Sequence, residues 1–143
     1  MRRSIIRKAI NLTFNEWRYL LEASYELFMA WIKVKFLPFR YYVKELEQKK
    51  HDETKLPDIK IVTHIKYAIN RFSKVSPFES RCLVKALAAR RMLNRRNYQS
   101  TMYLGLARNS DRSLKAHAWL ICQNEFVTGS SEYQQFTVIA TYI

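Results

Sequence analysis

The sequence contains very little glycine and proline, 2 and 3 residues among 143. Disordered chains are usually rich in these residues and poor in hydrophobic ones, whereas 48% of this chain is hydrophobic and 14% is aromatic. We therefore expect the chain to bury a core. Its length is close to that of one typical domain, so residues 1–143 are predicted to form a single domain.

Cysteine is equally scarce, and the two cysteines, Cys82 and Cys122, cannot supply a disulfide framework. The N-terminal stretch "MRRSIIRKAINLTFNEW" begins with basic residues, but its apolar part is too short and broken for a secretory signal. Long apolar runs are also missing, because "LFMAWI" is far shorter than the roughly 20 residues that span a bilayer. We expect a cytoplasmic protein, with peripheral contact to a membrane surface as an alternative.

Acidic residues are in the minority, since 12 Asp and Glu face 25 Lys and Arg and the formal net charge is +13. Such an excess predicts an anionic partner, which can be nucleic acid, an anionic membrane or an acidic protein segment. The sequence has no helix-turn-helix, RRM or zinc-finger pattern, so we expect no nucleic-acid partner. The basic clusters "MRRSIIRK" and "ARRMLNRR" are interpreted as solvated faces, with a dock for an acidic partner or for RNA as alternatives. Four arginines are predicted on or near the exposed side of their helix: Arg90, Arg91, Arg95 and Arg96.

The first part of the chain is predicted to be helical. Thr13 and Glu16 form a capping box ahead of a segment that stops before Pro38. This segment is apolar nearly all round, which is typical of deep burial or of a docking surface. After Pro57, "DIKIVTHIKYAINRF" has the apolar spacing of an amphipathic helix. The charged stretch "KELEQKKHDETKLPD" between them is predicted to be a solvated helix end and loop.

A third helix is predicted within "SPFESRCLVKALAARRML", and it carries Cys82. Ser76 and Ser80 are alternative N-caps. With Ser80 as the cap, Cys82 lies in the first turn, where free backbone N–H groups and the helix dipole lower a thiol pKa. With Ser76 as the cap, Cys82 lies in the second turn and this effect weakens. The other interpretation of Cys82 is a small buried residue.

From residue 100 onward the apolar period becomes that of strands. The segments "TMYLGLAR", "LKAHAWLIC", "EFVTG" and "FTVIATY" are short and are separated by polar turns. One of these turns is the pair Gln123-Asn124. The strands are predicted to form an antiparallel meander, and helices followed by such strands give an α+β fold class.

His117 lies in the second of these segments. Alternation along a strand puts His117 and Trp119 on one face, and Ala118 and Cys122 on the other. One interpretation is a core histidine bonded to a carbonyl. The other is that the face of His117 meets the start of the Cys82 helix, with the two side chains within about 4 Å. Cys122 is expected to be a core residue, and the remaining histidines, His51 and His64, are expected to be structural or solvated.

The sequence segments around these residues are similar to those of a known family. The segments "SRCLVKALAARRMLNRRNYQSTMYLGLAR", "LKAHAWLICQNEFVTG" and "FTVIATY", with "KFLPFRYY" upstream, resemble the stand-alone leader peptidases (B proteins) of lasso-peptide biosynthesis. That family is a branch of the transglutaminase-like superfamily. The resemblance implies a papain-like core of a helix plus an antiparallel sheet at 57–143, and an N-terminal helical lobe at 1–56. It also implies a cysteine endopeptidase in which Cys82 matches the nucleophile and His117 the general base.

The same resemblance implies a substrate and partners. The substrate is a ribosomally made lasso precursor, from which the leader is removed before an ATP-dependent macrolactam synthetase closes the ring. A separate small leader-binding protein is implied as a second partner. No cofactor is expected, and three histidines and two cysteines at these positions do not give zinc spacing.

One position departs from the pattern of the family. Many members have an Asp at the position that is Gly129 in this chain. The third catalytic group is then expected from Ser130, Glu132, a backbone carbonyl or a water, and Gly129→Asp should preserve or raise activity if the backbone tolerates a side chain. Two other functions stay open: a basic non-catalytic module that binds nucleic acid or an anionic membrane, and an acyl or amide transferase with the same Cys-His pair.

Overall fold

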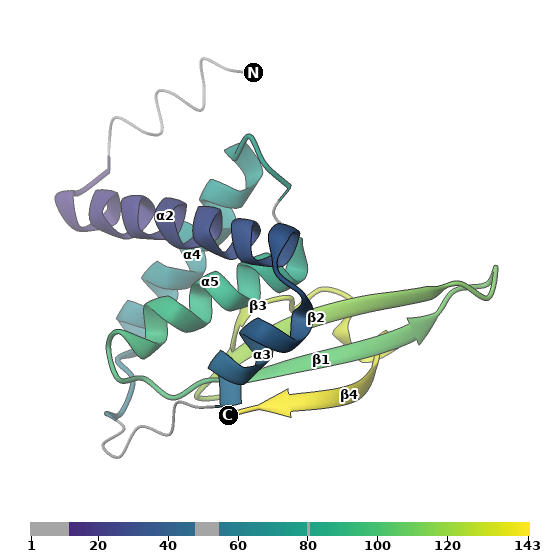
Figure 1. Ribbon diagram of the computed structural model, residues 1–143. Coiled ribbons are helices and arrows are strands. Elements are labelled where there is room, and N and C mark those ends of the chain that lie inside the picture. The colour runs from purple at the N-terminus through teal and green to yellow at the C-terminus, as the bar shows by residue number, and fades with distance from the viewer. Residues whose placement is uncertain (1–11, 48–54, 80) are drawn as a thin grey trace.

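The computed structural model describes residues 12–47, 55–79 and 81–143. Within these residues it is an α+β structure, as predicted, in which helices precede an antiparallel sheet (Figure 1). The helices are α2 (Phe14–Phe36), α3 (Phe39–Glu47), α4 (Ile59–Val75) and α5 (Cys82–Asn94). The strands are β1 (Thr101–Arg108), β2 (Leu114–Cys122), β3 (Glu125–Thr128) and β4 (Thr137–Tyr142), with a 3-10 turn, η1 (Tyr133–Gln135), before β4.

The boundaries of the first helices follow from local chemistry. Thr13 accepts a hydrogen bond from the backbone N–H of Glu16, whose carboxylate accepts one from the backbone N–H of Thr13, so the predicted capping box is confirmed. The helix ends at the residue before Leu37, since Pro38 cannot continue it. Asp58 caps α4 by accepting from the N–H of Lys60.

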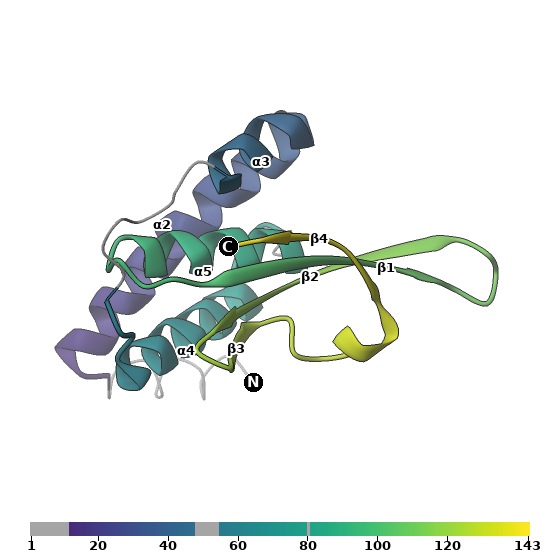
Figure 2. The ribbon, with the colours of Figure 1, turned by 90° about the horizontal axis from the view of Figure 1, so that it is seen from below.

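The sheet has the strand order β3-β2-β1-β4, so the predicted meander is wrong at its last step. Gln123 and Asn124 both have positive φ, 48° and 64°, which gives the tight turn that joins β2 to β3. The chain then crosses one face of the sheet through residues 129–136 and returns as β4 beside β1 (Figure 2). The crossing segment carries Tyr133 and Phe136, whose rings cover Trp119 and His117, and this packing is the reason for the longer route.

Helix α5 occupies the centre of the fold, because it contacts α2, α4, β2 and β3. It is consequently buried on most sides, and its fully or nearly buried residues include Val84, Ala88 and Met92. The small alanines allow the neighbouring helices and strands to approach closely. One core cluster therefore contains buried residues from all four helices and from the strands. The β1–β2 hairpin extends past the helices in both views (Figures 1 and 2).

Helix α2 buries only one stripe of its surface, formed by Ala23, Leu27 and Ala30 together with Glu26. Large apolar side chains remain exposed on its other sides: Phe14, Trp17, Leu21, Tyr25, Phe28 and Phe36. Of the two interpretations of its apolar surface, deep burial is therefore wrong for this side of the helix. In the described ranges, no helix has both the length and the apolarity that crossing a bilayer requires.

Candidate active site

Cys82 is the first residue of α5. The residue before it, Arg81, is the N-cap and has an extended backbone with φ −67° and ψ 164°. Ser76 instead ends α4, where its backbone N–H donates to Phe72 O. Of the two alternative N-caps, Ser76 is therefore wrong and Ser80 lies outside the described residues; the cap is Arg81, so Cys82 lies in the first turn. The earliest helical hydrogen bond at this end runs from Lys85 N to Arg81 O, 3.0 Å, so the N–H groups before it have no helical acceptor.

The N-terminus of α5 differs from those of α2 and α4. Thr13 and Asp58 each cap their helix with a side-chain oxygen, whereas Arg81 makes no such hydrogen bond. The first turn of α5 also contains no acidic side chain. The positive end of the helix dipole therefore faces Cys82 with no acidic side chain in the first turn of α5 to offset it.

The two cysteines have different environments. Cys82 is a free thiol at intermediate exposure and packs on the edge of the core cluster. Cys122 is 1% exposed, and its Sγ donates to Gln99 O at 3.4 Å. Burial raises the pKa of the Cys122 thiol, so this residue is held in the unreactive protonated form. The expectation that Cys122 is a core residue is confirmed.

His117 lies on β2, and its ring is held by one hydrogen bond and two aromatic contacts. Nε2 is 3.0 Å from Gly129 O. The ring stacks on Phe136 at 4.9 Å and on Trp119 at 5.8 Å between centroids. A carbonyl oxygen can only accept, so Nε2 carries the hydrogen and Nδ1 of the neutral ring keeps its lone pair. No hydrogen-bond partner of Nδ1 is found among the described residues.

The orientation of β2 differs from the sequence-based prediction. Ala118, Leu120 and Cys122 belong to the core cluster that contains α5, whereas His117 and Trp119 point to the opposite face. The face of His117 is covered by the crossing segment 129–136 and not by the start of α5. No hydrogen bond joins the Cys82 thiol to the imidazole in the described part of the chain. The physical reason is the large apolar surface of Trp119, which Tyr103 and Tyr133 cover on that side.

Gly129 is the residue that orients His117, and it does so through its backbone. It has φ +72°, and a Cβ added to it would lie 2.5 Å from Ala118 O and 2.7 Å from the Cβ of Trp119. The condition for a favourable Gly129→Asp change, a backbone that tolerates a side chain, is therefore not met. A backbone carbonyl was one of the four expected candidates for the third catalytic group. The sequence could not select it, because every residue has a main-chain carbonyl whatever its side chain is.

Glu132 is the acidic group of the same segment. Its carboxylate lies 2.8 Å from the Nζ of Lys115. The hydrogen bond and charge of Lys115 lower the pKa of Glu132, and His117 adds a smaller effect in the same direction. Glu132 is thus an anion near the imidazole that is already paired with a lysine.

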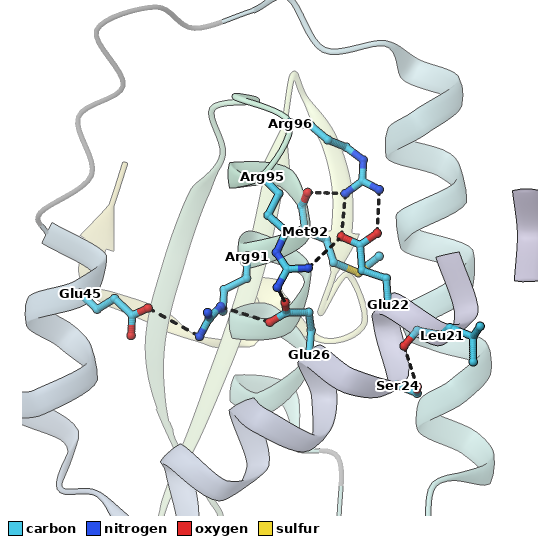
Figure 3. Close-up of polar contacts among 9 residues, drawn as sticks. All are labelled: Leu21, Glu22, Ser24, Glu26, Glu45, Arg91, Met92, Arg95 and Arg96. Atoms are coloured by element: carbon cyan, nitrogen blue, oxygen red, sulfur yellow. Dashed lines mark hydrogen bonds and ion pairs between the residues drawn. The ribbon is translucent and has the colours of Figure 1, made fainter. Parts of the chain in front are cut away.

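The basic cluster of α5 is engaged within the molecule, as Figure 3 shows. Arg96 forms a two-pronged ion pair with Glu22, at 2.7 and 2.9 Å, and Arg91 lies 3.1 Å from the buried carboxylate of Glu26. Arg95 also pairs with Glu26. The interpretation of this cluster as a solvated face therefore holds only in part, because Arg91 and Arg95 stay partly exposed while their charges tie this end of α5 to α2. The signal in the sequence was the pair Glu22 and Glu26, which lie four residues apart and so share one face of α2.

The prediction that Arg90 lies on or near the exposed side of its helix is wrong, because this residue is only 3% exposed. It donates to Ser100 O at 3.3 Å, Tyr142 O at 2.8 Å and Leu46 O at 3.2 Å. Burial lowers the pKa of its guanidinium. Arg90 thus joins α3, the start of β1 and the end of β4, and it offers nothing to an external ligand.

The other histidines have no role in this site. His64 lies on α4, with Nδ1 2.6 Å from Lys60 O and its ring 5.3 Å from that of Tyr19, so its assignment as structural is confirmed. His51 lies outside the described residues. Within the described ranges, no group of three His, Cys, Asp or Glu side chains is arranged to hold a metal ion.

Comparison with known proteins decides the family. The family model described as the transglutaminase-like superfamily matches residues 27–141. The chain belongs to this superfamily. Its members are often cysteine-dependent enzymes, and the matched region contains both Cys82 and His117. No curated protein and no solved structure gives a significant match.

Proposed function

We propose that this member of the transglutaminase-like superfamily is a cysteine endopeptidase that removes the leader from a ribosomally made lasso precursor peptide. The observation that carries the proposal is the position of Cys82 at the uncapped start of α5. Backbone N–H groups without a helical acceptor lie at that helix start, where they can stabilise the oxyanion that forms when a thiol attacks a carbonyl. The resemblance of the segments around Cys82 and His117 to the stand-alone leader peptidases supplies the substrate class.

The proposed reaction has two steps. His117 takes the proton of the Cys82 thiol as the sulfur attacks the carbonyl carbon at the junction of leader and core, and first-turn N–H groups of α5 stabilise the oxyanion. The C–N bond then breaks, the protonated His117 gives its proton to the departing amine of the core, and a thioester with the leader remains. In the second step, water attacks the thioester while His117 accepts its proton, so that the leader leaves as a carboxylic acid and the thiol is restored.

The position of His117 sets a condition on this mechanism. Nδ1 carries the lone pair, and it must approach the Cys82 sulfur when substrate is bound. Because β3 ends at Thr128, opposite Leu120, the segment that follows β3 is what borders the outer edge of β2 beside His117 among the described residues. We propose that substrate binding moves this segment and the ring toward the start of α5. Catalytic hydrogen bonds that form only in the substrate complex are common in such enzymes.

The proposed partners follow from the same reading. A small leader-binding protein presents the precursor, and an ATP-dependent macrolactam synthetase receives the freed core peptide. A peripheral membrane site and a cytoplasmic location are further parts of the proposal. The ion pairs of Arg91, Arg95 and Arg96 weigh against the alternative of a basic nucleic-acid-binding module, because carboxylates of the same molecule already neutralise these charges.

The test is cleavage of the precursor peptide encoded beside the gene, in the presence of its leader-binding protein and followed by mass spectrometry. Cys82→Ala should abolish cleavage, and His117→Ala should lower the rate by about 10²–10⁴-fold, which is the usual contribution of a general base. Cys122→Ala is the matched control and should keep most of the activity of the folded protein. Cleavage by the Cys82→Ala variant at the wild-type rate would contradict the proposal.

A further inference from the structure

A groove lies beside the start of α5. Its volume is about 680 Å³, within the range of roughly 300–1,000 Å³ that ligand sites usually have. One wall comes from the C-terminal half of α2, and the other comes from the segment before α5 and from its first turn. The residues that line it are Phe28, Trp31, Val34, Lys35, Pro77, Phe78, Glu79, Arg81 and Val84.

The groove is adjacent to Cys82. Arg81 precedes the cysteine and Val84 follows it within the same helical turn, and both line the groove. A peptide whose scissile bond lies at the Cys82 thiol therefore has neighbouring residues within reach of the groove, since about three extended residues cover roughly 10 Å.

The floor of the groove is aromatic. The ring of Trp31 lies 5.4 Å from that of Phe78 and 6.0 Å from that of Phe28, so the three rings form one continuous surface. Phe28 remains 44% exposed in spite of these contacts. Covering such a surface with an apolar side chain lowers the free energy of the complex, because the rings and the side chain both lose contact with water.

The rim carries an excess of positive charge. Nζ of Lys35 lies 4.7 Å above the Trp31 ring, and no carboxylate pairs with it in the described ranges. Arg81 is strongly exposed, and its guanidinium is 2.9 Å from Glu79. The single carboxylate of the rim is thus already paired, and Lys35 is the cation that remains for a ligand.

We propose that this groove is a substrate-recognition site, which binds a large apolar side chain of the peptide substrate next to an acidic residue, within about three residues of the scissile bond. The apolar side chain packs on Phe28, Trp31 and Phe78, and the carboxylate pairs with Lys35. This inference rests on the proposed function, because that function places the scissile bond at Cys82. It adds a sequence preference that membership of the superfamily does not supply.

The experiment measures peptide binding without catalysis. The Cys82→Ala variant is titrated with the blocked peptide acetyl-Gly-Glu-Leu-Gly-Gly-amide, and binding is measured by isothermal titration calorimetry. Two comparison peptides replace Leu by Ala or Glu by Lys. We expect the Leu peptide to bind about tenfold more tightly than the Ala peptide, since apolar pockets discriminate side chains by factors of roughly 10 to 200. The Lys peptide should also bind more weakly than the Glu peptide.

Two further variants locate the effect. In the Cys82→Ala background, Phe28→Ala should remove the preference for Leu, and Lys35→Glu should reverse the preference for Glu over Lys. Phe14→Ala is the control, because Phe14 is 79% exposed on the same helix and does not line the groove. Equal binding of all three peptides, or equal effects of Phe28→Ala and Phe14→Ala, would overturn the inference.

A last measurement connects the groove to the nucleophile. The Leu peptide should slow the alkylation of Cys82 by iodoacetamide in the wild-type protein, and it should do so in proportion to its occupancy of the groove. Binding with no protection would place the site away from the thiol and would also overturn the inference. Failure of the proposed function has a different signature, which is cleavage of the precursor by Cys82→Ala whatever the binding results are.

Discussion

Replacing Gly129 by Asp introduces the acid that the resemblance to the leader peptidases predicts at this position, and the structure predicts that the change destabilises the fold. A non-glycine residue in the left-handed region costs about 1–2 kcal/mol. The new Cβ would also lie 2.5 Å from Ala118 O, and relieving such contacts by shifting packed groups costs about 1–3 kcal/mol. The sum, about 2–5 kcal/mol, is a large part of the 5–15 kcal/mol that typically stabilises a domain.

The measurement is urea denaturation followed by far-UV circular dichroism, in which the midpoint should fall while the slope stays the same. Gly129→Ala isolates the backbone and contact costs from any effect of the carboxylate, and it should lose nearly as much stability as Gly129→Asp. Ser130→Asp is the control, because it adds a carboxylate one residue later at an exposed position. Stability of Gly129→Asp within about 0.5 kcal/mol of wild type, the range of an ordinary surface change, would refute this reasoning.

Two other predictions concern stability. Arg90→Met should destabilise the fold by roughly 2–4 kcal/mol in the same urea assay, because it leaves the carbonyls of Leu46, Ser100 and Tyr142 without their donor; wild-type stability would show that these bonds contribute nothing. Thr13→Ala should cost about 1 kcal/mol through loss of the cap. Hydrogen bonds from Thr13 lower the pKa of Glu16, so the capping box stabilises α2 fully above the unfolded pKa of Glu, about 4.3, and less as pH falls through the lower folded pKa. Wild type should therefore lose stability in this acidic range faster than Thr13→Ala, and parallel pH profiles of the two proteins would contradict the assignment.

The strands and the first two long helices could be predicted from the sequence because their signals are local. The capping box of Thr13 and Glu16, and the turn residues Gln123 and Asn124, act on their immediate neighbours. The start of α5 had no such signal, since its N-cap is an arginine that makes no side-chain hydrogen bond. The sequence offers Ser76 and Ser80 as alternative caps, but Ser76 belongs to the end of α4 and the N-cap is Arg81.

The arrangement of the site depended on contacts that no local pattern encodes. Alternation along β2 predicts that His117 and Trp119 share one face of the strand, but it does not predict which of the two faces packs on α5. That choice follows from residues 129–136, which supply Tyr133 and Phe136 as the cover of one face. The same segment leads the chain to β4, which pairs with the edge of β1 opposite to β2. One cause therefore explains both the wrong prediction of the strand order and the wrong prediction that the face of His117 meets α5.

The carbonyl of Gly129 affects how much catalytic rate is lost in the proposed mechanism because the usual aspartate is missing. In a triad, the acid holds the histidine in the correct tautomer and stabilises the imidazolium that forms. Exchange of that acid for an amide side chain costs about 10⁴-fold in rate mainly because the wrong tautomer results. A backbone carbonyl cannot donate, so the bond from His117 Nε2 to Gly129 O preserves the correct tautomer with Nδ1 as the base. The carbonyl lacks the full negative charge of a carboxylate, so it supplies less of the second function. In the proposed mechanism, the main-chain oxygen of residue 129 thus takes over the first function of the aspartate, so a glycine at this position is compatible with a Cys-His pair.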